Sequence, residues 1–366
     1  MKIAAYYYPG WHKCPIRNAS LPQGWSEWDL VYKATPRFEG HEQPNLPLWG
    51  KHDDSDPKNF ELKIQSALNH GVDAFIFAFY WSRGKILLDA ALDKGFLKSP
   101  NSGQLKFAVF WANRMPRWVL PVKDPAAMII DPKRLVYTDE KDFLEFVQFI
   151  AENYFSLPNY LKINEKPYLS IFDTNFFLRQ LGMEKAKNSI TRAKHWLKQN
   201  GFGGLHLAGI DPIPEFAGNL KEIGFDSVTH YVFMPDWKGE YLQDYWTSSN
   251  EKSEKWGDYM RISGLPYMPS VSTGWDATPR SSDYGKEKPR KYPWWPVITG
   301  RSPDRFRMIL EKALKFSYEN VFPEAPVFIS SWNEWSEGHY LEPDQKHGYS
   351  WLEAIKAARS SRFPNP

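Results

Sequence analysis

The chain has 366 residues, enough for two average domains or for a single (β/α)8 barrel, which needs roughly 250 residues or more. Its formal net charge of +3 is small for this length, and lysine and arginine are scattered rather than clustered, so neither nucleic acid nor an anionic membrane surface is an expected partner. Cys14 is the single cysteine, which excludes a disulfide framework and a cluster of thiolate metal ligands.

Aromatic residues make up 16% of the chain, with 17 Trp and 19 Tyr, more than a core needs. Faces of sugar rings carry C–H groups that stack on indole and phenol rings, so this surplus favours an oligosaccharide or polysaccharide partner. The alternative is a large core packed with aromatic side chains.

The sequence predicts no membrane-spanning helix, because it has no run of about 18 apolar residues. A strand-like segment starts at Lys2 and leaves no room for a signal peptide. We therefore expect a cytoplasmic location for the chain as it stands, or a periplasmic or cell-surface location if a leader has been removed.

Short apolar segments alternate with amphipathic segments along the chain. The segments that predict buried strands are 2–8, 73–80, 105–111, 167–172, 204–210, 226–231, 267–272 and 327–329. The segments that predict helices are 59–70, 85–96, 139–154, 181–200, 214–223, 240–262, 301–320 and 350–360.

This alternation predicts a single α/β domain over residues 1–366, a (β/α)8 TIM barrel with elaborated βα loops. A doubly wound open sheet would show the same alternation, but no glycine-rich dinucleotide fingerprint follows the first strand. The Gly- and Pro-rich stretch 274–300 is predicted to be a loop elaboration rather than a domain linker. The long segment 11–57 has no sustained period, and in it Trp25, Glu27, Trp28, Arg37 and His41 could line a site or tie the loop down.

Two carboxylates follow the last predicted strand in the stretch APVFISSWNEWSEGHYLEPD, residues 325–344. Glu334 and Glu337 lie among Trp332 and Trp335, where carboxyl groups are poorly hydrated, so we expect at least one raised pKa and a proton near neutrality. A three-residue separation on a tight turn would bring both side chains to one side. The alternative is structural, with the glutamates as charges and caps at a helix start and the tryptophans in the core.

Residues after the other predicted strands should converge on the same rim, where the strand ends of a TIM barrel meet. The candidate substrate-binding residues are Tyr8, His12, Trp81, Trp111, Asn113, Arg114, Asp173, Asp211, His230, Tyr231, Trp275, Asp276, Arg280, Trp332, Asn333 and Trp335. Such hydrogen-bonding groups and flat rings fit a sugar. Taken singly, Asp173 or Asp211 could equally cap the helix that follows it, and His230 could be a core histidine.

Glycoside cleavage usually needs one carboxylic acid to protonate the leaving oxygen and one carboxylate as base or nucleophile. Glu334 and Glu337 are therefore the candidate catalytic pair. The sequence predicts no metal site and no cofactor, because it has no HExxH motif, no cysteine pair and only dispersed histidines. It also lacks the GxSxG motif of serine hydrolases and a P-loop.

Six blocks carry a family resemblance. They are AAYYYPGWH (4–12), WSEWDLVYKATPRFEGHEQPNLP (25–47), FAFYW (77–81), FWANR (110–114), STGWDATPR (272–280) and WNEWSEGHYLEPD (332–344). In this order they resemble the WbsX-like proteins, often labelled glycosyltransferases of surface-polysaccharide clusters, and more distantly the glycoside hydrolase family 99 endo-mannosidases. The resemblance implies a (β/α)8 barrel and a route through a 1,2-anhydro sugar, in which Glu334 would assist the sugar 2-hydroxyl and Glu337 would protonate the leaving group.

Three functions follow as hypotheses. The first is a family 99-like glycoside hydrolase, retaining, that cleaves an α-linked, mannoside-like glycoside in a polysaccharide or glycan. The second is a WbsX-type glycosyltransferase in surface-polysaccharide biosynthesis, and the third is a non-catalytic carbohydrate-binding barrel. Against the second, the acidic run 53–56 precedes a helix instead of following a strand, and we interpret it as capping or solvated charge. The sugar, its linkage, endo or exo action and the oligomeric state stay open.

Overall fold

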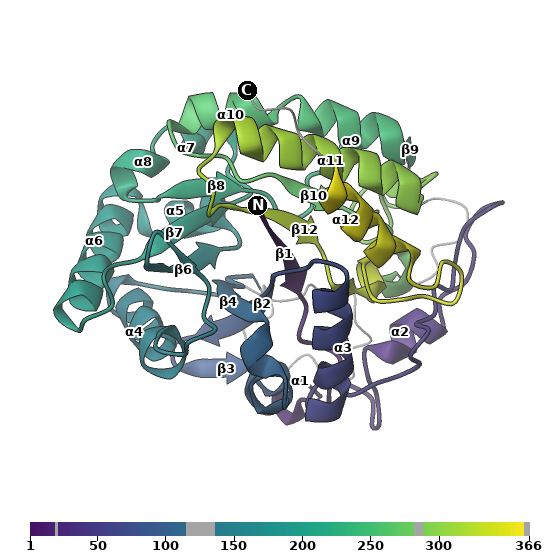
Figure 1. The fold of residues 1–366 in the computed structure, drawn as a ribbon, viewed down its shortest axis with the longest axis horizontal. Coiled ribbons are helices and arrows are strands. Elements are labelled where there is room, and N and C mark those ends of the chain that lie inside the picture. Colours follow the sequence, from purple (N-terminus) through teal and green to yellow (C-terminus); the bar gives the residue numbers. More distant parts are fainter. Residues whose placement is uncertain (19–20, 115–135, 282–287, 362–366) are drawn as a thin grey trace.

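The computed structural model describes residues 1–18, 21–114, 136–281 and 288–361. Within these ranges, eight parallel strands alternate with helices in the nearly closed (β/α)8 barrel that the sequence predicts (Figure 1). In chain order the strands are β1 (Lys2–Tyr7), β2 (Ala74–Ser82), β4 (Lys106–Trp111), β6 (Lys166–Ile171), β7 (His206–Ile210), β8 (Ser227–Thr229), β10 (Ser270–Ser272) and β12 (Pro326–Ser330).

The strands pair in the order β10-β12-β1-β2-β4-β6-β7-β8, so the first strand of the chain lies against the last. Between the two ends of this order, Val228 of β8 forms a parallel bridge with Tyr267, and the N–H of Met268 donates to the carbonyl of Val228 at 2.9 Å. This contact joins β8 to the segment that leads into β10. The carboxyl ends of the strands therefore share one rim.

The helices surround the sheet on its outer face (Figure 1). They are α3 (Pro57–Asn69), α4 (Glu140–Ile150), α5 (Thr174–Leu181), α6 (Met183–Gln199), α7 (Pro214–Ala217), α8 (Leu220–Ile223), α9 (Tyr245–Ser253), α10 (Trp256–Ser263), α11 (Pro303–Asn320) and α12 (Ser350–Ser360). Two short helices, α1 (Pro15–Asn18) and α2 (Trp28–Tyr32), lie in the long loop after β1.

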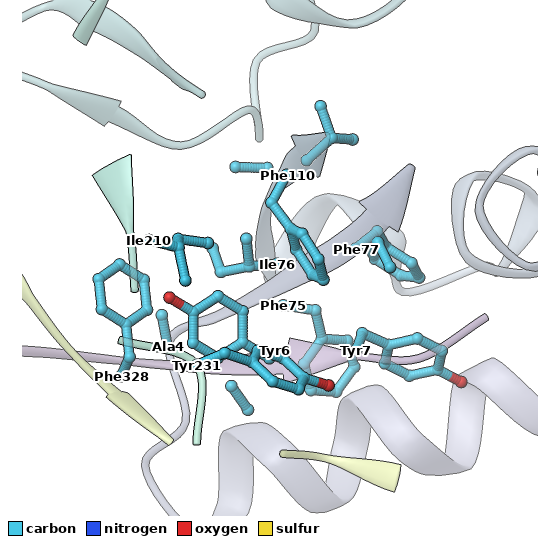
Figure 2. Close-up of a cluster of buried hydrophobic side chains, with 14 of the residues drawn as sticks. Ala4, Tyr6, Tyr7, Phe75, Ile76, Phe77, Phe110, Ile210, Tyr231 and Phe328 are labelled. Atoms are coloured by element: carbon cyan, nitrogen blue, oxygen red, sulfur yellow. The ribbon is translucent and has the colours of Figure 1, made fainter. Parts of the chain in front are cut away.

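Aromatic rings fill the inside of the barrel (Figure 2). The ring centroid of Tyr6 lies 5.5 Å from that of Phe110, 4.9 Å from that of Tyr231 and 5.1 Å from that of Phe328. Because successive side chains of a strand point to opposite faces, Tyr7 points outward, toward α3. The interior is a packed core, so a site for a ligand has to be sought at the rim.

The predicted helix 85–96 is wrong. At Arg83 and Gly84, β2 turns back into β3 (Lys85–Leu87), which pairs antiparallel with it. The two turn residues have φ angles of 49° and 75°, which a two-residue hairpin turn requires. An Arg-Gly pair is a weaker hairpin signal than Asn-Gly, and the apolar residues behind it mimic helical spacing. Short π and 3-10 turns, Ala91–Gly95 and Phe96–Lys98, follow.

Three other predicted helices are interrupted. Gly182, at φ 75°, separates α5 from α6, so the helix predicted for 181–200 begins at Met183. The carboxylate of Asp244 accepts a hydrogen bond from the N–H of Thr247 at 3.0 Å and starts α9, which leaves 242–244 as a strand. The prediction 240–262 thus contains β9 (Leu242–Asp244), α9 and α10, and 214–223 contains α7 and α8.

The insert after β10 is a loop elaboration that also supplies a strand. β11 (Val297–Thr299) pairs in parallel with β9, outside the barrel. Residues 282–287 of the predicted insert lie outside the described ranges. A further short strand, β5 (Lys162–Ile163), pairs antiparallel with β6.

Lys63 of α3 forms buried ion pairs with Asp54, which precedes α3, and with Glu342, which follows the last hairpin. Its ammonium is 1% exposed and lies 2.7 Å from Asp54 Oδ1 and 2.7 Å from Glu342 Oε1, and it donates to the hydroxyl of Tyr7 at 2.9 Å. The prediction that the run 53–56 serves as a cap is right for Asp56, which caps α3. It is wrong for Asp54, which is buried in this ion network.

We expect Lys63→Met to lower the free energy of unfolding by about 3–5 kcal/mol, because two buried carboxylates lose their cation. Urea denaturation measures this change. Lys58→Met, on the exposed side of the same helix, is the matched control and should change the free energy by less than about 0.5 kcal/mol. Equal effects of the two substitutions would contradict a stabilising role for the network.

Candidate functional site

A small hairpin follows β12 and carries both glutamates. β13 (Asn333–Glu334) and β14 (His339–Tyr340) pair antiparallel, joined by a 3-10 turn (Trp335–Glu337) and Gly338 at φ 71°. The loop after β10 packs against this turn, since the N–H of Asp276 donates to the carbonyl of Glu337 at 2.8 Å. The carboxylate of Asp276 is held by side chains of the long first loop, with His41 Nε2 at 2.8 Å and Gln43 Nε2 at 2.6 Å.

The guanidinium of Arg280 joins the two glutamates. Arg280 closes a 3-10 turn (Thr278–Arg280) after β10, and its side chain is 6% exposed. Its Nη2 lies 2.6 Å from Glu334 Oε1, and its Nη1 lies 2.6 Å from Glu337 Oε1. Because both carboxylates contact one planar group, their side chains face the same point at the rim.

Arg280 makes three more hydrogen bonds. Nη2 donates to Glu27 Oε1 at 2.9 Å, Nη1 donates to the hydroxyl of Tyr292 at 2.9 Å, and Nε donates to Ser336 Oγ at 2.9 Å. A guanidinium has five N–H groups, so this set matches its full donor capacity. The orientation of Arg280 is therefore fixed from several sides.

Glu27 is a third carboxylate in the same cluster. Its side chain is fully buried, and its Oε2 accepts hydrogen bonds from the hydroxyl of Tyr8 at 2.8 Å and from Arg17 Nη1 at 3.0 Å. Arg280 and Arg17 thus face Glu27, Glu334 and Glu337. One negative charge is in excess when all three carboxyl groups are ionised, so a single bound proton would neutralise the cluster.

Burial and charge separate the pKa values of the pair. Burial raises the pKa of Glu334 well above its ordinary value, and although Arg280 lowers it, Glu337 and Glu27 raise it further. Burial also acts to raise the pKa of Glu337, but Arg280, together with hydrogen bonds from His339 and Tyr292, outweighs burial and lowers that pKa to about 2. The surroundings therefore favour the protonated form of Glu334 and the ionised form of Glu337.

His339 contacts the carboxylate oxygen of Glu337 that Arg280 does not bind. Burial lowers the pKa of His339, so its ring is neutral near neutrality. Its Nε2 lies 3.4 Å from Glu337 Oε2, and Ser330 Oγ lies 3.3 Å from its Nδ1, which fits a proton on Nε2. Trp275 stacks on the imidazole at 5.7 Å, and Tyr231 meets it edge-on at 5.6 Å.

Of the predicted substrate-binding residues, the structure brings Tyr8, Tyr231, Trp275 and Arg280 to the glutamate pair. Trp332, Asn333 and Trp335 adjoin Glu334 in sequence, but their side chains hold the hairpin in place. The indoles of Trp332 and Trp335 donate to the buried carboxylate of Glu342 at 3.0 Å and 2.7 Å. The amide of Asn333 binds both backbone polar groups of Tyr8, at 2.8 Å and 2.9 Å.

Four predicted residues have other partners. Trp81 donates to Asp142 of α4 at 2.9 Å, and the ring of Trp111 packs against phenylalanines of α4 and α5, so both indoles lie outside the sheet. His230 is buried and pairs with a tyrosine hydroxyl at 2.9 Å. His12 is buried beside the first loop, and burial lowers its pKa.

Another group at the rim binds mainly within itself. The amide of Asn113 bonds both the N–H and the carbonyl of Asp173, and the carboxylate of Asp173 pairs with Arg114 and caps α5. Asp211 accepts a hydrogen bond from the N–H of Tyr231 at 3.0 Å, and burial raises its pKa to about 7. The structural alternative considered for Asp173, a helix cap, is what the structure shows.

Several residues of the cluster were not among the predicted site residues. They are Arg17, Glu27, Tyr292, Ser336 and His339. A sequence signal existed for Glu27, because WSEW at 25–28 repeats the W-x-E-W pattern of WNEW at 332–335, and both glutamates bind Arg280. Ser336 and His339 stand in the stretch that carries the glutamate pair, whereas Arg17 and Tyr292 lie in the first loop and in the insert, whose paths the sequence does not give.

The described ranges contain no group of three or more His, Cys, Asp or Glu side chains placed to hold a metal ion. Among the helices of the same ranges, none has the length and apolar character that crossing a membrane requires.

Comparisons with known proteins place this geometry in context. A family model described as glycosyltransferase WbsX matches residues 3–355. The chain is 29% identical over 374 residues to the uncharacterized protein WxcX of Xanthomonas campestris pv. campestris, covering 97% of this chain and 49% of that protein. The chain thus spans about half the length of the curated relatives it matches.

Solved structures share the fold. A GH99 endo-alpha-mannosidase from Bacteroides thetaiotaomicron superposes with a TM-score of 0.60 at 14% identity, covering 98% of each chain. A glycoside hydrolase-like protein superposes with a TM-score of 0.56 at 16% identity, covering 98% of this chain and 93% of the other. At these identities the likeness establishes the barrel.

We expect Gly338→Ala to displace the turn that holds Glu337. The residue has φ 71°, and an added Cβ would lie 2.8 Å from the backbone nitrogen of Asp276, so the free energy of unfolding should fall by about 1–3 kcal/mol. Gly257→Ala in α10 is the control, because its Cβ would meet nothing within 4 Å, and it should be neutral or stabilising. Equal stability of the two variants in thermal unfolding would contradict the packing described for Gly338.

Proposed function

We propose that this chain, which belongs to the glycosyltransferase WbsX family, is a glycoside hydrolase that cleaves an α-linked, mannoside-like glycoside in a polysaccharide or glycan. The observation that carries the proposal is the pair Glu334 and Glu337, each 2.6 Å from one guanidinium, with pKa values moved in opposite directions. Two carboxyl groups whose surroundings separate their pKa values can divide acid and base roles. The fold shared with an endo-alpha-mannosidase and the aromatic residues beside the pair add support.

The charges suggest which glutamate does what. Glu334 holds a proton that it can give to the glycosidic oxygen, and Glu337 is ionised and can accept one. In a route with retention, the sugar 2-hydroxyl loses its proton to Glu337 and its oxygen bonds to the anomeric carbon. The glycosidic bond breaks, and its oxygen takes the proton of Glu334. Water then opens the 1,2-anhydro sugar: the water oxygen bonds to the anomeric carbon and gives a proton to Glu334, while the bond from that carbon to O2 breaks and O2 takes back the proton of Glu337.

This assignment exchanges the roles that the family resemblance implies for Glu334 and Glu337. The two arrangements differ in which of the two carboxyl groups holds the single proton, so both have the same total charge. Arg280 contacts both carboxylates and would stabilise either arrangement. The kinetics of variants at the two positions therefore have to distinguish them.

We expect Glu334→Gln to lose about 10²–10⁴-fold in kcat/KM on an ordinary glycoside but far less on an aryl glycoside with an activated leaving group, because such a group needs little acid assistance. Glu337→Gln should lose activity on both substrates, since no group remains to take the proton of the 2-hydroxyl. Steady-state kinetics on the two substrates measure these losses.

The matched control is Glu324→Gln, which alters an exposed glutamate just before β12 and should leave both rates unchanged. Sparing of Glu337→Gln instead of Glu334→Gln on the activated substrate would restore the roles that the resemblance implies. Full activity of both variants on both substrates would refute the catalytic pair.

The second candidate is glycosyl transfer, which the name of the matched family favours. A nucleotide-sugar donor needs cations for its diphosphate, but Arg280 and Arg17 are already ion-paired with carboxylates. We therefore expect calorimetry with nucleoside diphosphates and Mn²⁺ to show no tight binding. Tight, metal-dependent binding would favour the transferase over the hydrolase.

A further inference from the structure

Two W-x-E-W segments, 25–28 and 332–335, converge on one nitrogen atom. Arg280 Nη2 lies 2.9 Å from Glu27 Oε1 and 2.6 Å from Glu334 Oε1. The hydroxyl of Ser336 lies 3.1 Å and 3.4 Å from the same two carboxylate oxygens. The carboxylates of Glu27 and Glu334 therefore lie side by side on the same donor groups, although they come from opposite ends of the chain.

The two carboxylates differ in how well their negative charges are compensated. Glu27 has a second guanidinium at its Oε2, that of Arg17 at 3.0 Å, and the hydroxyl of Tyr8 at 2.8 Å. Glu334 shares Arg280 with Glu27 and with Glu337. Glu27 therefore has more donors of its own to compensate a negative charge than Glu334 has, and a negative charge this close opposes ionisation of Glu334.

We propose that Glu27 is a positioning residue that keeps the proton on Glu334 in the resting site, because its carboxylate shares Arg280 Nη2 and Ser336 Oγ with Glu334 and thereby places a negative charge beside it. The inference rests on the proposed function, because it concerns how the same catalytic pair is prepared. It assigns Glu27 no contact with the substrate.

The other groups around the pair do not supply this charge. The titratable groups packed against the cluster are Arg17 of α1, Tyr8 after β1, Tyr80 of β2, Tyr231 after β8, Arg280 after β10, Tyr292 of the insert, and Glu337 and His339 of the hairpin. Burial raises the pKa of each of these tyrosines above its ordinary value and lowers that of His339, so all are neutral near neutrality. Among the described residues, the negative charges that face Glu334 are those of Glu337 and Glu27.

Infrared spectroscopy of the protein without substrate tests the proton directly. At neutral pH the wild-type spectrum should contain a protonated-carboxyl component that Glu334→Gln removes, which assigns it to Glu334. We expect Glu27→Gln to remove the same component, because the negative charge beside Glu334 is then gone while the contact of Glu334 with Arg280 Nη2 remains. Glu39→Gln, an exposed change in the same loop, should leave it intact. Persistence of the component in Glu27→Gln would overturn the proposal.

The pH profile provides a readout that a merely structural role would not move. Loss of the negative charge at Glu27 lowers the pKa of Glu334, so the limb of kcat/KM that Glu334 governs should move to lower pH by about one unit or more. For a proton donor this is the alkaline limb. A lower kcat with an unmoved limb would contradict the proposal.

Arg17→Met provides a second variant if Glu27→Gln does not fold. Without Arg17, Glu27 loses its second guanidinium and its advantage in charge compensation over Glu334, so the Glu334 component should weaken, whereas an unchanged component would overturn the proposal. The proposed function and the role of Glu27 can be refuted separately. A component lost in Glu27→Gln without any glycosidase activity in the wild type would refute the proposed function alone. Activity that depends on Glu334, with the component unmoved in Glu27→Gln, would refute this inference alone.

Discussion

The contact on which the site depends is the one between a buried guanidinium and three carboxyl groups. A charge removed from water is costly unless it is paired and hydrogen-bonded, and Arg280 meets both conditions through Glu27, Glu334 and Glu337. Its donors are directed toward groups from the first loop, the insert and the last hairpin. Segments far apart in the sequence are thereby locked together at the rim of the barrel.

Behind this contact lies a second buried network. Glu342 accepts the indoles of Trp332 and Trp335 and pairs with Lys63, which also pairs with Asp54. Through Glu342, the tryptophans beside Glu334 therefore connect the hairpin that carries the glutamate pair to the helix layer. A site that needs two carboxyl groups in fixed relation gains from such support, because small displacements alter both hydrogen bonding and pKa.

The barrel and the glutamate pair were predictable from the sequence, because strand period and the spacing of Glu334 and Glu337 are local signals. The contacts of Glu27 were not, since they depend on how the long first loop folds over the rim. The sequence also did not predict where the indoles of Trp332 and Trp335 point. A tryptophan next to a candidate catalytic glutamate gives the same sequence pattern whether its ring faces a sugar or the core. The prediction of a helix at 85–96 was wrong because the chain makes a hairpin turn at Arg83 and Gly84, although the residues that follow have helical spacing.

The most direct test of the central claim is neutron diffraction from crystals of the unliganded protein, exchanged into heavy water at neutral pH. We expect a deuteron on the carboxyl group of Glu334, none on Glu337 or Glu27, and a fully deuterated guanidinium at Arg280 between them. A deuteron on Glu337 with Glu334 ionised, or no deuteron on any of the three carboxyl groups, would contradict the division of charge that we describe.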